Sequence, residues 1–299
     1  MANGTQSRGI GLVLLATLGW SLSGLFVRLM PELDGWQINC WRGLWMAVAL
    51  LTYLIASHGL KFGEQFRSIP FWAMFISALC FAVGTTFYVS ALTLMSTATV
   101  SVIGATSPLI TALLSPWITG ERPNILAWIS AVLALVGMAV IAKNGIDVGH
   151  ALGLIVSLGV PITFALQTLL LRKYRNHDMM FSICLGGFLA FFLAGIGSIE
   201  FGHHSPLNID SASFWLLMLM GPLQLSIPLI FYGLGAKYIQ AVTLSLIAML
   251  DAVINPFWSW LFVGEIPETA SFIGGGIILA AVFLAVMGSQ FLGKSAQQL

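Results

Sequence analysis

The chain has 299 residues, of which 58% are hydrophobic and 8% are charged, with a formal net charge of +1 at pH 7. This composition excludes an ordinary water-soluble domain, whose interior is too small to hide so much apolar surface, so we expect the lipid bilayer to be its solvent. The near-neutral charge argues against a nucleic-acid partner, and three cysteines without metal-ligand spacing lead us to expect no metal and no cofactor.

Ten apolar segments are long enough to cross a bilayer as helices. In chain order these spans one to ten cover residues 9–30, 35–57, 71–93, 97–118, 125–142, 150–172, 179–200, 212–236, 241–263 and 270–292. The connections between them are short. The sequence therefore predicts a single all-α integral-membrane domain over residues 1–299, without a soluble insertion.

Lysine and arginine are concentrated on one side of the predicted spans. If the N-terminus is cytoplasmic, the cytoplasmic segments hold Arg8, Lys61, Arg67, Arg122, Arg172, Lys173, Arg175, Lys237 and Lys294, and the opposite segments hold Arg28 and Lys143. Cytoplasmic loops carry this excess of positive charge, so we expect both termini in the cytoplasm. Arg42 falls inside span two. We interpret it as a side chain that reaches back to the outer headgroups, with attraction of anions as the alternative.

The second half of the chain repeats the first at an offset of 144 residues. The matching positions include Thr99 and Thr243, Ser101 and Ser245, Tyr88 and Tyr232, Gly120 and Gly264, Glu121 and Glu265, and Pro123 and Pro267. Each half, residues 9–142 and 150–292, holds five spans, and an odd number means that the halves enter the membrane in opposite directions. The sequence thus predicts an inverted repeat, in which a transport site lies at the repeat interface near the membrane midplane.

Prolines and polar side chains mark six of the spans. Prolines inside a span free backbone groups that protein or cavity water must satisfy, and we name Pro108, Pro161, Pro228 and Pro256 as candidate hinges. Together with the polar residues of span three and the repeat symmetry of spans one and six, they predict a cavity surrounded by spans one, three, four, six, eight and nine. Spans two, five, seven and ten are expected outside it. The alternative is that the prolines merely kink their helices.

Asp251 is a carboxylate near the middle of span nine, and Ser107 stands at the equivalent position of the first half. A charge at this depth costs about 2.5–3.5 kcal/mol on insertion scales, so it is a functional-site hypothesis by default. We expect Asp251 to bind the ammonium group of a substrate or, alternatively, to carry a proton. A structural hydrogen bond to a neighbouring helix is the third interpretation.

The other candidate substrate-binding residues lie mid-span on the same six spans. We expect a substrate carboxylate to accept hydrogen bonds from Thr99, Ser101, Gln167 and Asn255, and a substrate side chain to stack on Trp20, Tyr88, Phe164 and Tyr232. Small-molecule pockets combine mostly apolar walls with a few placed polar groups in this way. No catalytic residue is expected, because the five histidines all lie in loops or at span ends.

The ten spans, the five-plus-five duplication, the Gly-Glu-x-Pro turns before spans five and ten, and the Gly-Leu opening of spans one and six (Gly11–Leu12, Gly153–Leu154) resemble the drug/metabolite transporter superfamily. Within it the chain is most similar to the EamA-type exporters, and among these to the YddG aromatic amino acid exporters. The resemblance implies export of amino acids and related metabolites across the bacterial inner membrane by alternating access.

Export of drugs or toxic cations such as methyl viologen is the alternative within the same resemblance. An intramembrane enzyme or a channel is the alternative from another class of protein. The expected partners are a small-molecule substrate and the lipid bilayer, with the protein acting as a monomer or a homodimer.

Overall fold

The computed structural model describes residues 2–59, 69–94, 97–142, 151–202, 205–264 and 269–295, and its regular elements are all helices. The first half contains α1 (Ala2–Ser21), α2 (Ser23–Arg28), α3 (Gly35–His58), α5 (Phe71–Leu94), α6 (Thr97–Gly104), α7 (Ser107–Ile118) and α8 (Ile125–Ala142). The second contains α9 (Ala151–Lys173), α10 (Met180–Glu200), α11 (Ser211–Met220), the π-helix η3 (Gly221–Ser226), α12 (Ile227–Gly235), α13 (Ala241–Ala248), α14 (Asp251–Val263) and α15 (Thr269–Ser295).

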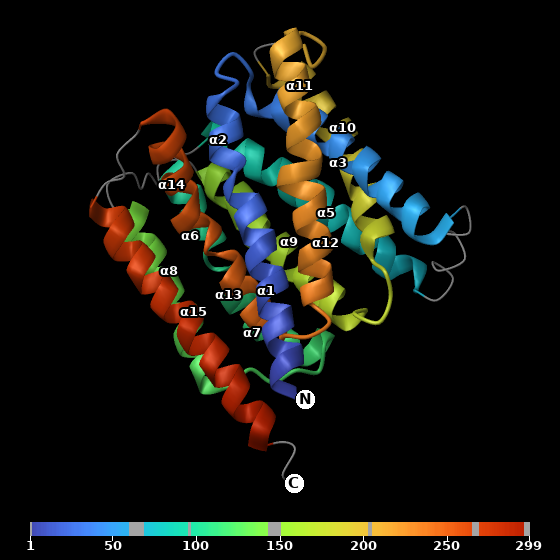
Figure 1. The fold of residues 1–299 in the computed structure, drawn as a ribbon. Coiled ribbons are helices and arrows are strands. Elements are labelled where there is room, and N and C mark those ends of the chain that lie inside the picture. The colour runs from blue at the N-terminus through green and yellow to red at the C-terminus, as the bar shows by residue number, and fades with distance from the viewer. Residues whose placement is uncertain are drawn as a thin grey trace.

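Within the described residues, ten helical stretches are long and apolar enough to cross a membrane, which confirms the predicted number of spans. Span one is α1 and α2, span four is α6 and α7, span eight is α11, η3 and α12, and span nine is α13 and α14. Figure 1 shows α1 beginning and α15 ending on the same face of the bundle, which we call the terminal face. The fold is the predicted inverted repeat, since each half has five spans.

The helices form a central group flanked by two pairs. The pair α8 and α15 lies along one edge, the pair α3 and α10 lies along the other, and α1, α9 and α13 stand between them (Figure 1). Helix α5 packs on both α9 and α10, and α1 packs on α12. The outer surfaces of α8 and α15 are apolar and exposed, as at Ile129, Val132, Phe272 and Phe283. This arrangement suits helices whose solvent is lipid, because each helix satisfies its own backbone hydrogen bonds.

Spans four and nine are interrupted at equivalent places. The interruption falls at residues 105–106 between α6 and α7 and at residues 249–250 between α13 and α14, again 144 residues apart. Pro108 explains the first position, because the opening turn of a helix does not need the N–H that proline lacks. Ala252 stands at the equivalent place in span nine, so no proline marks the second interruption. Interrupted helices of this kind present half-helix ends to the substrate in secondary transporters.

The repeated Gly-Glu turn has a backbone reason. Gly120 has φ 76° and Gly264 has φ 78°, each just after the end of α7 or α14. A glycine in this left-handed conformation commonly closes a helix, because a Cβ atom would be strained there. The equivalence of Gly120 and Gly264 is therefore confirmed in conformation, whereas Glu265 and Pro267 lie outside the described residues.

The contact between α8 and α15 depends on two glycines whose backbones touch. A Cβ atom at Gly137 would lie 2.8 Å from the Gly274 carbonyl oxygen, and a Cβ atom at Gly274 would collide with the Gly137 carbonyl oxygen. Small residues allow such close approach of helices in lipid. Spans five and ten therefore pack against each other within one chain.

We expect Gly274→Ala to destabilise the protein by about 1–3 kcal/mol, because a backbone oxygen cannot move aside cheaply. Gly276→Ala is the matched control two residues along α15, where a Cβ atom meets nothing within 4 Å. It should be neutral or stabilise the helix by roughly 0.5–1 kcal/mol. Thermal unfolding of both purified variants measures the difference, and equal midpoints would contradict the close contact.

Candidate functional site

Two adjoining cavities lie among the central helices. The first, of about 200 Å³, we call the Arg42 cavity; its polar lining includes Arg42, Thr85, Thr163, Gln167, Thr168 and Tyr232. The second, of about 290 Å³, we call the Asp251 cavity; its polar lining includes Ser23, Ser101, Ser107, Ser245, Asp251 and Asn255. Trp20, Tyr88, Val160 and Phe164 line both. The two cavities are therefore neighbouring compartments of one site, with aromatic rings at their boundary.

The rings form a contiguous cluster. The Trp20 centroid lies 5.0 Å from that of Tyr232 and 6.3 Å from that of Phe164, and Phe164 and Tyr232 are 6.1 Å apart. These separations fall within the range of favourable aromatic contacts. The Tyr232 hydroxyl is fixed by a 2.9 Å hydrogen bond with the Thr168 hydroxyl. Tyr88 stands apart from the cluster and is 38% exposed where it faces the two cavities.

The repeat accounts for this arrangement. Trp20 and Phe164 are 144 residues apart, as are Tyr88 and Tyr232, so each half contributes one ring from its first span and one from its third. The inverted repeat brings both pairs to the interface between the halves. The two tyrosines were recognisable as a repeated pair in the sequence, whereas Trp20 and Phe164 differ in type and needed the fold to be matched.

Asp251 is the first residue of α14, directly after the interruption of span nine. In the described part of the chain no side chain forms an ion pair or a hydrogen bond with its carboxylate, and the neighbouring Ala252 N–H donates to the Met249 carbonyl oxygen at 3.2 Å. A helix N-terminus stabilises a negative charge through its unpaired N–H groups and its dipole. The fold thus holds the carboxylate at mid-span and leaves it able to accept hydrogen bonds from a ligand.

The predicted hydrogen-bonding residues are divided among three places. Ser101 and Asn255 line the Asp251 cavity, and Gln167 lines the Arg42 cavity. Thr99 is only 3% exposed and lines neither of these cavities, so the structure does not bring it to the site. The reason is helical geometry, because two residues along an α-helix correspond to a rotation of about 200°. Thr99 and Ser101 therefore point in different directions from α6.

The four prolines proposed as hinges have different settings. Pro108 opens α7 and Pro228 opens α12 just after η3, where its ring packs on Gly19. Pro161 lines the Asp251 cavity, yet α9 continues through it without interruption. The interruption of span nine precedes Pro256, whose side chain lies outside the described residues. Whether any of these prolines acts as a hinge remains a prediction.

The predicted six spans supply the walls of both cavities, with two exceptions from spans that were expected outside. Met138 of α8 lines the Asp251 cavity, and Arg42 of α3 lines the Arg42 cavity. The interpretation of Arg42 as a side chain that reaches the headgroups was therefore wrong. Helix α3 packs closely on α10, with Gly43 against the Gly187 backbone, and this contact sets the rotation that turns Arg42 inward.

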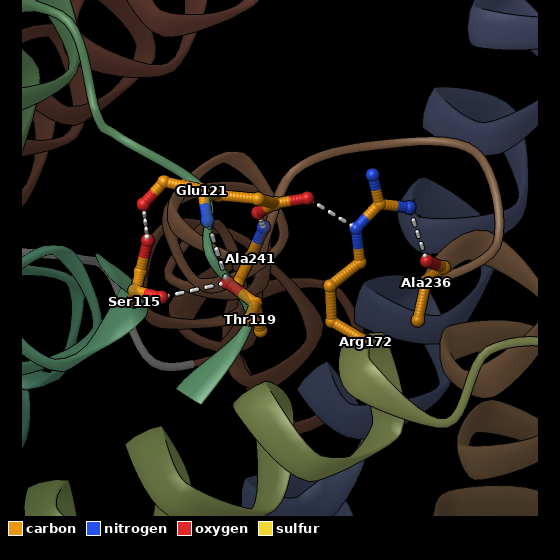
Figure 2. A network of polar contacts seen from close by, with 6 residues as sticks. All are labelled: Ser115, Thr119, Glu121, Arg172, Ala236 and Ala241. Atoms are coloured by element: carbon orange, nitrogen blue, oxygen red, sulfur yellow. Dashed lines mark hydrogen bonds and ion pairs between the residues drawn. The ribbon is translucent and has the colours of Figure 1, made fainter. Parts of the chain in front are cut away.

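An ion pair joins the lining spans at the terminal face (Figure 2). Glu121, in the turn between α7 and α8, accepts a 2.6 Å hydrogen bond from Arg172 Nε through one carboxylate oxygen. Its other oxygen accepts a 3.1 Å bond from the Ala241 N–H at the start of α13. Arg172, near the end of α9, also donates a 2.7 Å bond from Nη1 to the Ala236 carbonyl beyond α12. One carboxylate and one guanidinium thereby connect the ends of spans four, six, eight and nine.

The turn that presents Glu121 is itself held by short-range bonds. Ser115 Oγ donates to the Glu121 carbonyl at 2.7 Å, and Thr119 Oγ1 donates to the Ser115 carbonyl at 2.9 Å (Figure 2). The Glu121 N–H donates to Thr119 Oγ1 at 3.3 Å. Leu171, directly before Arg172, lines the Arg42 cavity. The ion pair therefore lies near the end of the cavity that faces the terminal face.

The sequence model of the EamA-like transporter family matches the chain twice, over residues 7–143 and 148–287. The chain is a member of the EamA-like transporter family. The two matches follow each other along the chain, one in each half of the inverted repeat. Ten apolar helices and this membership make the protein a multi-pass membrane transporter.

Similar proteins agree with this assignment. The EamA-like chain is 22% identical over 243 residues to the uncharacterized transporter YojE of Bacillus subtilis, with 79% of each chain covered. It is 23% identical over 195 residues to the uncharacterized transporter YdfC of the same organism, and the match spans 63% of this chain and 62% of YdfC. An uncharacterized transporter of Archaeoglobus fulgidus is 21% identical over 167 residues, 56% of this chain and 58% of that protein.

A solved crystal structure, described only as that of a protein, has the same fold. It superimposes with a TM-score of 0.82 over 96% of this EamA-like transporter and 99% of its own chain, at 16% identity. Sequence identity of this level supports the arrangement of helices alone. The cavity residues described above are therefore the basis for any statement about the substrate.

Proposed function

We propose that this EamA-like transporter exports amino acids, including aromatic ones, and related metabolites across the bacterial inner membrane by alternating access. The observation that carries the proposal is the position of Asp251, a carboxylate without a charged partner in the described residues, beside a cluster of aromatic rings. A carboxylate in the interior of a membrane protein needs a positive partner, and the ammonium group of an amino acid supplies one. The rings offer a stacking surface for its side chain.

The interrupted helices support alternating access over a channel. Half-helix ends at mid-membrane are typical of carriers whose halves move relative to each other around a fixed site. Both repeats also line the cavities: Trp20 and Tyr88 come from the first half, and Phe164 and Tyr232 come from the second. In this proposal the Glu121–Arg172 ion pair belongs to the side that faces the cytoplasm.

Purified protein in proteoliposomes tests the proposal directly. We expect uptake of labelled phenylalanine or tryptophan to saturate and to be accelerated by unlabelled amino acid on the opposite side. Both properties distinguish a carrier from a channel. The same measurement with and without a pH gradient shows whether transport is coupled to protons. Flux that neither saturates nor responds to amino acid on the far side would reject the carrier proposal.

Export of organic cations is the second candidate. A carboxylate beside aromatic rings also suits a quaternary or planar cation, which is attracted to the ring faces as well as to the charge. Competition decides between the two: methyl viologen should inhibit amino acid flux weakly if amino acids are the substrates. Strong inhibition, together with transport of methyl viologen itself, would favour the second candidate.

Orientation has its own test. We expect a reporter joined after Leu299, or placed in the connection near Arg175, to report the cytoplasm, and a reporter near His203 to report the periplasm. The expectation follows from the excess of lysine and arginine on the terminal face. A periplasmic signal from the fusion after Leu299 would reverse the proposed orientation.

A further inference from the structure

The Arg42 cavity contains a positive charge that the proposed role of Asp251 does not explain. Arg42 Nη2 donates a 2.8 Å hydrogen bond to the neutral Asn39 Oδ1, while Arg42 Nε is buried and has no hydrogen-bond partner in the described part of the chain. A guanidinium is always charged and has five N–H donors. A charge removed from water is stable only when it is paired and hydrogen-bonded. The cavity is thus built around a cation that lacks an anion.

Gln167 adds a second donor to the same cavity. Its side chain lines the cavity and is 7% exposed, and its Oε1 accepts a 3.2 Å hydrogen bond from Ser77 Oγ, so the amide nitrogen is the end still without a partner. In the part of the chain that the structure describes, this Nε2 has no hydrogen-bond partner. Helices α3 and α9 therefore each bring a side chain with an unpaired N–H donor to the wall of one small cavity, and a carboxylate is the group that accepts hydrogen bonds from such donors.

Arg42 and Asp251 lie on opposite sides of the boundary between the cavities. Arg42 lines only the first cavity and Asp251 lines only the second, and Tyr88 lines both. Tyr88 therefore stands between the compartment that contains Arg42 and the compartment that contains Asp251. A ligand that occupies the space beside Tyr88 therefore meets a positive group in one direction and a negative group in the other.

The repeat shows that neither charge serves packing common to both halves. At the 144-residue offset, Asp251 corresponds to Ser107 and Arg42 corresponds to Gly186. A Cβ atom at Gly186 would lie 2.8 Å from the Ala78 carbonyl oxygen, so the second half has no room for a side chain there. Each half has contributed one charge of opposite sign that the other half lacks. A ligand that carries both an anionic and a cationic group explains why Arg42 and Asp251 both differ from their counterparts in the other half.

We propose that Arg42, assisted by Gln167, binds the carboxylate of the substrate and so selects a zwitterionic amino acid over an amine or an organic cation. This inference rests on the proposed function, because it assigns the second charged group of the same substrate. The ammonium group faces Asp251, the carboxylate faces Arg42, and the side chain lies against Trp20 and Phe164. A substrate without a carboxylate leaves Arg42 unpaired, and a cation is repelled by it.

Binding of a matched pair of ligands to the purified protein in nanodiscs tests this assignment. L-phenylalanine and L-phenylalaninamide have nearly the same shape, but only the first has a carboxylate. By titration calorimetry we expect the wild type to bind phenylalanine at least about tenfold more tightly, the equivalent of one charged hydrogen bond. Arg42→Gln should bring the ratio of the two affinities close to one while leaving the affinity for the amide intact. Arg42→Lys should retain part of the preference.

Arg175→Gln is the control, since this exposed arginine lies in the connection after α9 and lines neither cavity. It should keep the wild-type ratio. Gln167→Glu provides a second variant that does not depend on the folding of Arg42→Gln: a carboxylate beside Arg42 should lower the ratio by competing with the ligand. A wild-type ratio in both Arg42→Gln and Gln167→Glu would overturn the proposal.

A second pair of ligands tests the carboxylate site at Arg42 independently of the proposed function. If the wild type neither binds nor transports amino acids, the proposed function fails, and 3-phenylpropionate and 3-phenylpropionamide then test the anion site alone. Preference for the acid in the wild type, and its loss in Arg42→Gln, would still support a carboxylate site at Arg42. No preference for the acid in the wild type would overturn it.

Discussion

Replacing Asp251 with asparagine is expected to lower transport by at least about tenfold while leaving the protein folded. The amide keeps the shape of the side chain and removes the burial penalty of the charge. It also removes a charge-assisted hydrogen bond to the substrate, worth about 1.5–3 kcal/mol. Since every 1.4 kcal/mol corresponds to about a factor of ten, kcat/KM in proteoliposomes is the quantity to measure.

Asp210→Asn is the control for the same chemical change outside the membrane. Asp210 caps α11 by accepting hydrogen bonds from the Ala212 and Ser213 N–H groups, and asparagine caps a helix nearly as well. Transport by this variant should equal that of the wild type. Full activity of Asp251→Asn at every pH and substrate concentration would leave only a structural role for Asp251.

The pH gradient separates the two functional roles of Asp251. If the carboxylate carries a proton, wild-type transport should depend on the gradient and the asparagine variant should lose that dependence. If the carboxylate binds the substrate ammonium, the variant should show a higher KM while its response to the gradient stays in place. Initial rates at several substrate concentrations, with and without a gradient, distinguish the two outcomes.

Replacing Glu121 with glutamine is expected to destabilise the terminal face and to open it toward the cavity. Arg172 has only 9% of its side chain exposed and Glu121 19%, so the variant leaves an uncompensated charge in a largely buried place. Breaking a buried ion pair by removing one partner costs about 3–5 kcal/mol. The Ala241 N–H also loses its charged acceptor, which weakens the start of α13. Thermal unfolding should show the loss of stability.

A double variant shows how much stability comes from the interaction between Glu121 and Arg172 rather than from each side chain alone. If the cost comes from the unpaired guanidinium, Glu121→Gln combined with Arg172→Gln should be less destabilised than the sum of the two single variants. Residues in contact typically show coupling energies of about 0.5–3 kcal/mol. Strict additivity would mean that the ion pair contributes nothing beyond its individual hydrogen bonds.

Opening of the terminal face is measured with the native Cys80, which lines the Arg42 cavity. In a background with Cys40→Ala and Cys184→Ala, Cys80 is the one remaining thiol of the three in the chain. We expect Glu121→Gln to raise its reaction with a membrane-impermeant thiol reagent added from the terminal side. Unchanged labelling together with unchanged stability would contradict a closing role for Glu121.

The sequence by itself determined the number of spans, the duplication and the position of the acid. Lipid selects long apolar segments, because only a helix satisfies its backbone within one segment, and this signal is read directly from composition. The duplication follows from matches at a constant offset, as with Tyr88 and Tyr232. Asp251 was evident because a carboxylate at mid-span is rare and expensive. Amphipathicity did not indicate which side of a helix faces the cavity, because nearly every side of these helices is apolar.

The tertiary structure alone decided which way the side chains point and which distant segments meet. In a helix that is apolar all round, composition does not define its rotation, so only packing of Gly43 on Gly187 reveals that Arg42 faces the cavity. Glu121 meets Arg172 and Ala241, residues 51 and 120 positions away, through the antiparallel order of the spans. No proline opens the helix after the interruption before Asp251, and only the structure shows that this interruption lies 144 residues after the one between α6 and α7.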